Sequence, residues 1–320
     1  MGHGSYTASD WEKLMESKGI SSSSSANNIF KSRSMDDKYN PRLFQFRESC
    51  DSNDSPLATP IIIGFDVTGS MGYLAEEIAK NALNKTILNI YDKNPVTNPH
   101  VLCAAIGDVK DNAPLQVTQF EADVRVVEQL MDLWLEGAGG DSPEDYNLLW
   151  YFADRHTKTD AYEKRNKKGF LFTIGDATVH SFISSEGLKK VFGDNESLKS
   201  NKELLQNVQK KYEVFHIVTK NIAVVQDWEQ YLPGHVAYIS VTNIRYISEV
   251  IISLMQLANG MTKDEVFSQW DDENTAKALM EALKTVNIEI SGNMQNSKTD
   301  KQSCQNAGHE KKDPFWKKLF

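Results

Sequence analysis

One short loop of this sequence combines a carboxylate with two hydroxyl groups. Asp66 ends the apolar run Ile61–Asp66, and Thr68 and Ser70 follow at every second position. Gly69 lies between the hydroxyls and lets the loop turn tightly. Such a set of oxygens can hold a hard divalent cation, and a strand-end aspartate can also act as a nucleophile in phosphoryl transfer. The loop is therefore a candidate for either chemistry.

Three further acids follow turns or strand ends elsewhere in the chain. Asp108 comes after the apolar run at 100–107, and Asp176 comes after the run at 169–175. Asp141 lies in a glycine-rich loop between two predicted helices. Close carboxylates resist ionising together, so their convergence would call for a cation. All these candidate ligands are oxygens, without His or Cys, and oxygen ligands favour Mg²⁺ or Mn²⁺ over zinc.

The apolar runs predict the elements that would bring these loops together. Continuous apolar runs are typical of strands buried on both faces, as in a parallel sheet. The predicted strands are 61–66, 100–107, 115–120, 169–175, 213–219 and 235–240. The predicted helices are 9–18, 73–91, 124–135, 144–156, 224–231, 242–258, 262–270 and 273–286. Their alternation predicts an α/β fold: a doubly wound, mostly parallel, Rossmann-like sheet with helices on both faces. Ligands bind such sheets at the carboxyl ends of the strands.

Composition divides the chain into four segments. Residues 1–58 are predicted to form an extension, partly disordered or wrapping, with a capping box at Ser9–Glu12 and a five-serine run. Residues 59–260 form the main domain, and residues 261–290 add C-terminal helices. Residues 291–320 are rich in Asn, Gln, Lys and Ser, which predicts a disordered tail.

The tail ends in an aromatic and basic peptide. From Lys298 onward it carries a net charge of +3, whereas the whole chain carries −9. Aromatic side chains at the end of a polar linker are costly unless they are used, so we expect a docking peptide for a protein groove, or weak contact with a membrane surface. The residues predicted to dock are Phe315, Trp316, Leu319 and Phe320.

Composition also excludes several classes of protein. With 320 residues, 40% of them hydrophobic, one large domain with appendages is the expectation. The acidic balance argues against nucleic-acid binding, which needs a basic surface. Three widely spaced cysteines without a CxxC motif favour a reducing cytoplasm. We expect neither a secretory signal in the first 30 residues nor a transmembrane segment, because the longest apolar stretch, near 250–258, is too short.

Three of the loops resemble those of von Willebrand factor A (vWA) domains. The sequence Asp66-Val67-Thr68-Gly69-Ser70 is similar to the D-x-[ST]-x-S loop that opens the family's metal-ion-dependent adhesion site (MIDAS). Gly139–Glu144 (GGDSPE) resembles the second metal loop as it stands in an intracellular, bacterial or phage-type branch, and Ile174–Ala177 resembles the third. These motifs occur in the family's order across about residues 59–258.

The resemblance implies a function as well as a fold. It implies a non-catalytic interaction module that binds Mg²⁺ (or Mn²⁺) and docks or regulates a protein partner in an intracellular multiprotein system. Asp141 stands where integrin-type domains have Thr, and its charge favours the cation while weakening capture of an acidic partner residue. The implied metal-site residues are Asp66, Thr68, Ser70, Asp141 and Asp176, with Asp108 just outside the ligand set.

Two other functions stay open. A Mg²⁺-dependent phosphatase-like hydrolase could use Asp66 as nucleophile, but such enzymes need D-x-D, and Thr68 occupies the place of the general acid. A purely structural assembly subunit would use the cation only to hold the loops together. Neither nucleotide-binding glycine motif is present, and we expect no enzymatic activity.

The titratable neighbours of these loops have simpler explanations. Glu144 and Asp145 are predicted to lie in the first turn of a helix, where their charge favours the helix dipole. His180, His216 and His235 are scattered, and we expect them to be packed or surface residues rather than catalysts.

Overall fold

A computed structural model gives the structure of residues 7–20, 24, 26–53, 55–78, 83–139 and 142–288. Asp141 therefore lies outside the described residues. The same is true of the predicted docking peptide at Phe315, Trp316, Leu319 and Phe320. Both predictions stay predictions.

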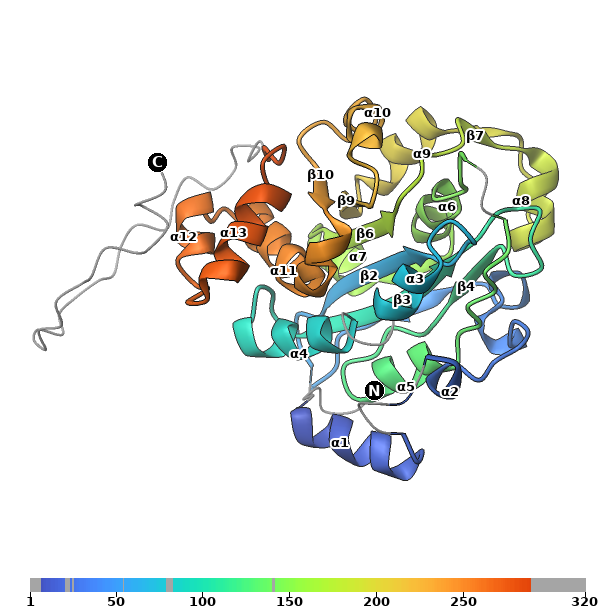
Figure 1. Ribbon diagram of the computed structural model, residues 1–320. Helices are drawn as coiled ribbons and strands as arrows, with labels where there is room; N and C mark the ends of the chain where they lie inside the picture. Colours follow the sequence, from blue (N-terminus) through green and yellow to red (C-terminus); the bar gives the residue numbers. More distant parts are fainter. Residues whose placement is uncertain are drawn as a thin grey trace, which may run out of the picture.

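A six-stranded sheet forms the centre of the molecule, and its strand order is β10-β9-β6-β2-β3-β4 (Figure 1). All neighbouring strands run parallel except β3 and β4, which are antiparallel. The fold is thus α/β with a mostly parallel sheet, as predicted. The strands span β2 (Thr59–Asp66), β3 (Pro99–Ile106), β4 (Leu115–Val117), β6 (Gly169–Gly175), β9 (Tyr212–Thr219) and β10 (Val236–Ile239).

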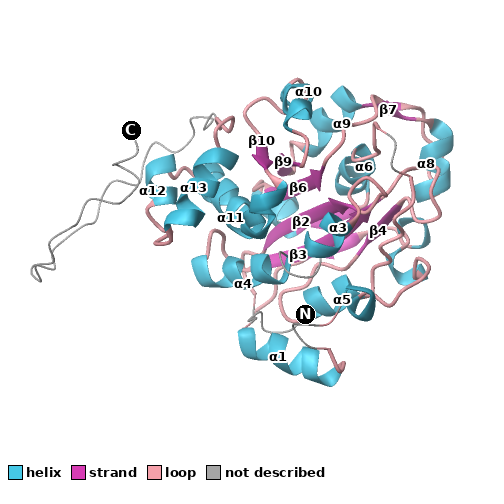
Figure 2. Ribbon diagram, viewed as in Figure 1, coloured by secondary structure: helices cyan, strands magenta, loops and turns pink. Residues whose placement is uncertain are grey.

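Helices cover both faces of the sheet, and Figure 2 shows them around the central strands. One face packs against α3 (Tyr73–Glu77), α4 (Leu83–Lys93), α5 (Arg125–Met131), α11 (Ile247–Ala258), α12 (Lys263–Phe267) and α13 (Glu273–Ala282). The other packs against α6 (Asn147–Arg155), α8 (Ser185–Phe192), α9 (Asn201–Val208) and α10 (Val225–Glu229). No helix among the described residues is long and apolar enough to cross a bilayer.

The central strand β2 is buried on both faces, which explains why its sequence is continuously apolar. Ile61 and Ile63 are fully buried in one hydrophobic core, and Ile62 is fully buried in the other. At Gly64 a Cβ atom would lie 2.3 Å from a methyl carbon of Leu149 in α6, so only glycine lets the helix approach this closely. Burial on both faces leaves no position for a polar residue before Asp66.

The N-terminal segment lies against the main domain. Its strand β1 (Arg47–Ser49) pairs in parallel with β5 (Thr157–Thr159), which precedes α7 (Asp160–Arg165). The buried guanidinium of Arg47 donates to the carbonyl oxygen of Val117 in β4 at 3.1 Å. Residues 26–50, which begin with α2 (Ala26–Ile29), therefore follow the domain surface.

The first helix begins differently from the prediction. The helix α1 spans Ala8–Ser17, and its capping box is formed by Thr7 and Asp10. The hydroxyl of Thr7 accepts from the Asp10 amide, and the Asp10 carboxylate accepts from the Thr7 amide. The predicted box at Ser9–Glu12 was wrong by two positions because Thr7 offers an equivalent hydroxyl closer to the N-terminus.

Two other elements near the site also differ from the prediction. The predicted helix 144–156 begins only at Asn147, and residue Glu144 instead forms an isolated bridge with Val179. The sequence analysis did not identify α8 and α9, nor the small antiparallel sheet of β7 (Phe182–Ile183) and β8 (Lys199–Ser200).

Candidate metal centre

Three neighbouring parallel strands bring three of the predicted acids to one edge of the sheet. Asp66 ends β2, Asp108 follows β3 and Asp176 follows β6. Because β2 lies between β3 and β6, the chain leaves β2 toward one side and later returns on the other. This is a topological switch point, where a doubly wound sheet opens a crevice for a ligand.

Asp66 is a fully buried carboxylate held by three donors. Its Oδ1 accepts from the backbone amide and from the hydroxyl of Thr68, both at 2.7 Å. Its Oδ2 accepts from the hydroxyl of Tyr146 at 2.7 Å. Burial raises the pKa of Asp66 to about 6, although these hydrogen bonds favour the charged form. The side chain is therefore fixed in position from both of its oxygens.

The two hydroxyl groups of the loop lie side by side. The Ser70 hydroxyl donates to Oδ1 of Asp176 at 2.8 Å, and the Thr68 hydroxyl donates to Asp66. The two hydroxyl oxygens are 3.4 Å apart. Because the carboxylates accept the hydroxyl protons, the lone pairs of both oxygens stay available to a cation. Ser70 is only partly buried, so this side of the centre opens to solvent.

Tyr146 holds Asp66 from the buried side of the centre through its hydroxyl group. The sequence analysis did not identify this residue. Its ring is fully buried against His216 and Trp228, at centroid distances of 5.1 and 5.4 Å. A Cβ atom at Gly175 would lie 1.9 Å from its hydroxyl oxygen, so the end of β6 leaves room for this side chain. No local pattern points to Tyr146, because it lies 80 positions from Asp66 in the sequence.

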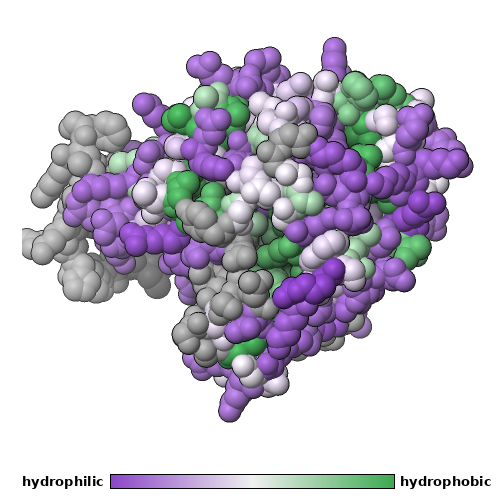
Figure 3. Space-filling model, turned by 45° about the vertical axis from the view of Figure 1, so that its right-hand side comes forward, coloured by the Kyte–Doolittle hydropathy of each residue, from purple (hydrophilic) through white to green (hydrophobic). Residues whose placement is uncertain are grey.

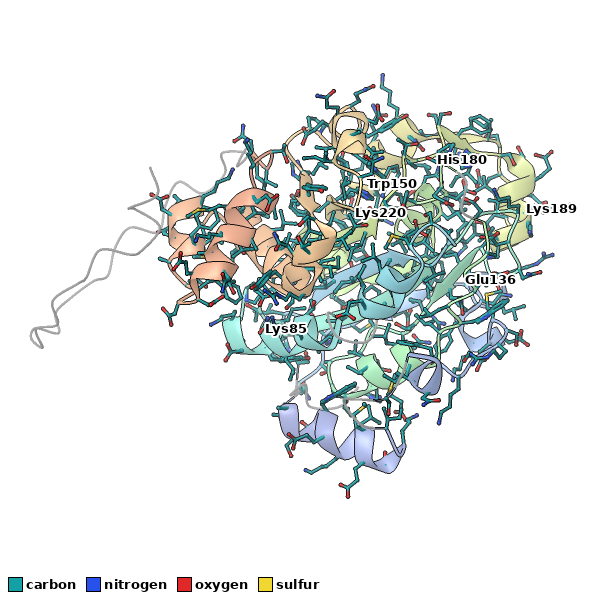
Figure 4. The ribbon with its side chains drawn as sticks, viewed as in Figure 1. Lys85, Glu136, Trp150, His180, Lys189 and Lys220 are labelled. Carbon is teal, nitrogen blue, oxygen red and sulfur yellow. The ribbon has the colours of Figure 1, made fainter. Side chains whose placement is uncertain are left out.

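Lys220 brings a positive charge to the same edge. Its ammonium group lies 3.1 Å from Oδ2 of Asp176 and donates to the backbone carbonyl of Ser70 at 2.8 Å. The residue directly follows β9, and its side chain is 48% exposed. Figure 4 labels it near the middle of the view. The sequence analysis did not identify Lys220, so this lysine is an addition to the site.

Glu144 is a buried acid next to the centre, not an exposed helix acid. Only 1% of it is exposed, and neither carboxylate oxygen has a hydrogen-bond partner among the described residues. Burial, followed by the charges of Asp66 and Asp108, raises the pKa of Glu144 to about 10. The prediction of a first-turn role was wrong because residues 144–146 stay outside α6.

Asp108 lies close enough to Glu144 for its charge to help raise the pKa of Glu144. It is 1% exposed, and its Oδ1 accepts from the amide of Asp145 at 3.1 Å. Its Oδ2 lies 3.0 Å from the ammonium group of Lys110. No hydrogen bond joins Asp108 to the Asp66 loop within the described part of the chain, and its predicted position just outside the ligand set stays a prediction.

The described donors fit a hard divalent cation. The loops contribute hydroxyl and carboxylate oxygens only, two hydroxyls have free lone pairs, and Glu144 offers an orphaned carboxylate close by. Asp141 cannot be placed, since it is not described. The predicted metal-site residues that the structure brings together are Asp66, Thr68, Ser70 and Asp176.

Comparisons with known proteins give likenesses of fold only. No family model and no curated protein matches the sequence. Similar solved structures include the pilus adhesin SpaC from Lactobacillus rhamnosus GG (8% identity, TM-score 0.44) and proximal thread matrix protein 1 from the mussel byssus (12%, 0.43). A von Willebrand factor type A protein from Catenulispora acidiphila is also similar (12%, 0.36). These alignments cover 66%, 65% and 62% of this chain.

The chain spans less than half of each of these proteins, namely 31%, 49% and 42% of their lengths. At such identities and TM-scores the likenesses carry nothing about activity or partners. What this chain has in its own right is a mostly parallel α/β sheet with three of the predicted acids, Asp66, Asp108 and Asp176, at one edge. In fold, the chain is similar to von Willebrand factor A domains.

Proposed function

We propose that this chain is a non-catalytic docking module that binds Mg²⁺ (or Mn²⁺) at the edge of its sheet and uses the bound cation to engage a protein partner. The orientation of the hydroxyl protons carries the proposal. Thr68 and Ser70 both donate to carboxylates, so both turn their lone pairs away from those acids. A pair of hydroxyl oxygens arranged in this way is suited to direct contact with a hard cation.

The remaining residues of the centre would have supporting roles. Asp66 and Asp176 hold the two hydroxyls in place, and Glu144 adds a buried carboxyl group beside them. The cation, when bound, would supply positive charge and an open coordination position for an oxygen atom of the partner. Lys220 would then move away from Asp176, which its exposed stem permits.

The surroundings of the centre are suited to a protein partner. Ile222 lies two residues beyond Lys220 and is 64% exposed, so the centre has an apolar side chain close to it in the sequence. Hydrophilic residues cover most of the face in Figure 3, with smaller apolar patches between them. The vWA family, which the loops resemble, commonly mediates protein interactions. A modest interface anchored on a cation fits this kind of surface.

The state of Asp66 supports a non-catalytic role. A phosphatase-like nucleophile needs a carboxylate oxygen that can reach a substrate. Both oxygens of Asp66 are engaged in hydrogen bonds, and the residue is fully buried. Tyr146 and Thr68 would have to give up these bonds before Asp66 could attack a phosphate.

Calorimetric titration of Mg²⁺ and Mn²⁺ into the chelator-treated full chain tests the cation site. We expect saturable one-site binding that Ser70→Ala removes. Ser240→Ala is the matched control, because its hydroxyl contacts only Thr242 after β10. Binding that survives Ser70→Ala, or its loss in both variants, would contradict the assignment.

A second experiment tests the docking role. Proteins retained by the immobilised wild-type chain in Mg²⁺ should be released by a chelator and should not be retained by Ser70→Ala. Retention that ignores both the chelator and the variant would favour a structural subunit. Mg²⁺-dependent turnover of a phosphate ester that is abolished by Asp66→Asn would instead favour a hydrolase.

A further inference from the structure

A second group of metal-ligating side chains lies beside the proposed Mg²⁺ centre. One ligand atom each from Asp108, Asp145 and His180 lies within 4.8 Å of the other two. These residues line a cavity of about 360 Å³ that also borders Phe182 and Lys110. The group comes from three segments: the loop after β3, the turn before α6 and the stretch before β7.

The two carboxylates are held by the backbone in a reciprocal way. Oδ1 of Asp108 accepts from the Asp145 amide at 3.1 Å, and Oδ2 of Asp145 accepts from the Val109 amide at 2.8 Å. Each carboxylate therefore uses one oxygen to join the two loops and keeps the other oxygen for a different partner. Oδ2 of Asp108 is buried without a hydrogen bond in the described structure, and its close neighbour is the Lys110 ammonium at 3.0 Å.

The backbone of His180 is fixed so that the imidazole stays beside these acids. Its amide donates to the carbonyl oxygen of Glu144 at 3.0 Å. Its carbonyl oxygen accepts from the side-chain amides of Asn147 at 2.9 Å and Asn201 at 2.7 Å, and both asparagines are buried. Figure 4 places His180 toward α8 and β7, apart from Lys220. Hydrogen bonds of this kind around a metal-ligating residue hold its side chain in position.

Glu144 is a further buried acid beside Asp108, although it lies outside the lining of the cavity. It is 1% exposed, both of its carboxylate oxygens lack a hydrogen-bond partner among the described residues, and it faces Asp108. Asp108 lines the cavity, and its buried Oδ2 has no hydrogen-bond partner among the described residues, so a positive charge beside it would be stabilising. Lys110 is about half exposed, so it compensates only from the open side of the cavity.

The ligand set differs from that of the first centre in its chemistry. Imidazole nitrogen is a ligand for zinc and other first-row transition metals, whereas Mg²⁺ prefers oxygen only. Two carboxylates and one imidazole with an open cavity leave further positions for water or a ligand. We propose that Asp108, Asp145 and His180 form a second cation site, selective for a divalent transition metal of the Zn²⁺ type. The site is separate from the proposed Mg²⁺ centre and does not depend on it.

Cobalt absorption spectroscopy tests this site in the full chain. Co²⁺ serves as the visible probe, excess Mg²⁺ is present throughout, and Zn²⁺ is then added to displace the probe. We expect a saturable Co²⁺ band with one equivalent per chain that Zn²⁺ abolishes. His180→Ala should weaken Co²⁺ binding by roughly 100-fold or more, since losing even a residue that only orients a metal ligand costs about 10- to 100-fold.

The variants separate a metal ligand from a structural residue. Because the hydrogen bonds of His180 within the described structure use its backbone, His180→Ala should leave the circular dichroism spectrum and the midpoint of thermal unfolding close to wild type. Asp145→Asn is a second ligand variant and should also weaken the band. His235→Ala is the matched histidine control, because its ring contacts the Pro233 carbonyl and the Glu213 carboxylate instead of Asp108 and Asp145, and it should leave the band unchanged.

Two results would overturn the proposal. One is the absence of saturable Co²⁺ or Zn²⁺ binding in the folded wild-type chain. The other is a band that survives His180→Ala but is lost in Ser70→Ala, which would place the probe in the first centre. If Ser70→Ala removes Mg²⁺ binding and leaves the Co²⁺ band intact, both sites stand. If Mg²⁺ fails to bind while the band depends on His180, only the proposed function fails.

Discussion

Tyr146 connects the buried side of the first centre to the aromatic core behind it. In Tyr146→Phe the ring keeps its packing on Trp228, whereas Oδ2 of Asp66 loses its donor. We expect the free energy of unfolding to fall by about 1–3 kcal/mol, the usual range for a buried polar group left without a partner. Mg²⁺ affinity should fall by about 10-fold, as for other residues that orient a metal ligand.

Urea unfolding and calorimetric titration measure the two effects of Tyr146→Phe. Tyr151→Phe is the matched control, because its hydroxyl bonds to Asp194 at 2.6 Å, away from the edge of the sheet. The control should lose stability without losing Mg²⁺ affinity. Equal Mg²⁺ affinities in wild type and Tyr146→Phe would show that the hydroxyl does not position Asp66.

The ammonium group of Lys220 lies at the first centre and balances the negative charge of Asp176. Lys220→Met removes the ammonium group that contacts Asp176. A bound metal cation then no longer competes with this ammonium group for the Asp176 carboxylate. We expect Mg²⁺ affinity to rise up to about 5-fold, since exposed ion pairs are typically worth less than about 1 kcal/mol. Lys189→Met, on α8, is the control for a lost charge elsewhere and should leave the titration unchanged. Weaker binding in Lys220→Met would mean that the lysine supports the cation.

Local patterns could predict only part of the site. The Asp66 loop and Asp176 follow strands whose apolar runs are visible in the sequence, so their meeting at one edge is predictable. Glu144 and Lys220 were not predicted to belong there, because their burial and their partners depend on packing between distant segments. An acid near a helix start gives the same sequence pattern whether it is exposed or buried.

At the scale of elements, strands were easier to predict than helices. The bounds of β6 were predicted to the residue and those of β2 within two, because burial on both faces leaves an uninterrupted apolar run. The helices α8 and α9 have N-cap serines at Ser184 and Ser200, and these signals could have found them. Both helices are only eight residues long and expose one face, so their apolar residues are too few to form a clear pattern.

The close contact between the end of β6 and Tyr146 predicts that replacing Gly175 lowers the stability of the protein. In Gly175→Ala the new methyl group would overlap the Tyr146 side chain, with its closest approach at 1.9 Å. We expect a loss of about 1–3 kcal/mol in the free energy of unfolding, as for other overpacked cores, and weaker Mg²⁺ binding because Tyr146 must move.

Chemical denaturation with and without Mg²⁺ measures both effects of Gly175→Ala. Gly187→Ala in α8 is the comparison, since its new methyl would approach other side chains no closer than 3.3 Å. There the gain in helix propensity offsets the tighter contact, and the net change should stay within about 1 kcal/mol. A stable Gly175→Ala protein with normal Mg²⁺ binding would show that α6 has freedom to shift.

At the scale of the molecule, both appendages described here join the main fold. Val266 in α12 and Leu279 in α13 are fully buried in the same core as β2. Tyr39 from the N-terminal segment is buried in that core too, and Lys38 beside it pairs with Asp132 at 2.9 Å. The docking of these segments depends on contacts between distant residues, which no local sequence pattern reveals.

The buried histidines lower the stability of the protein in mild acid, whereas the raised pKa values of Asp66 and Glu144 act in the opposite direction. His216 is fully buried against Trp228, and burial lowers the pKa of His216 well below 6.5. Only the unfolded chain then takes up this proton as the pH falls below about 6.5, so stability falls in that direction, by at most about 1.4 kcal/mol per pH unit for one group. His100, buried between Ser49 and Ser55, has a lowered pKa and acts in the same direction.

Urea unfolding at about pH 7 and at about pH 5 tests this contribution. His216→Gln does not titrate and keeps a polar group for Thr173, so it should lose less stability between the two pH values than wild type. His235→Gln is the control at a more exposed position and should follow wild type. Identical pH dependence in wild type and His216→Gln would mean that His216 does not stay neutral in the folded protein.

The pairing of β1 with β5 has a consequence for the chain during its synthesis. Asp51, just after β1, bonds through its amide to the carboxylate of Asp160, 109 positions later. The central strand β2 likewise borders β6, which is made only after β3, α5 and α6. A nascent chain must therefore emerge from the ribosome with its most apolar strand still unpaired on one side, a state open to wrong pairing. We expect this protein to depend on slow translation or on a chaperone until residue 175 has emerged.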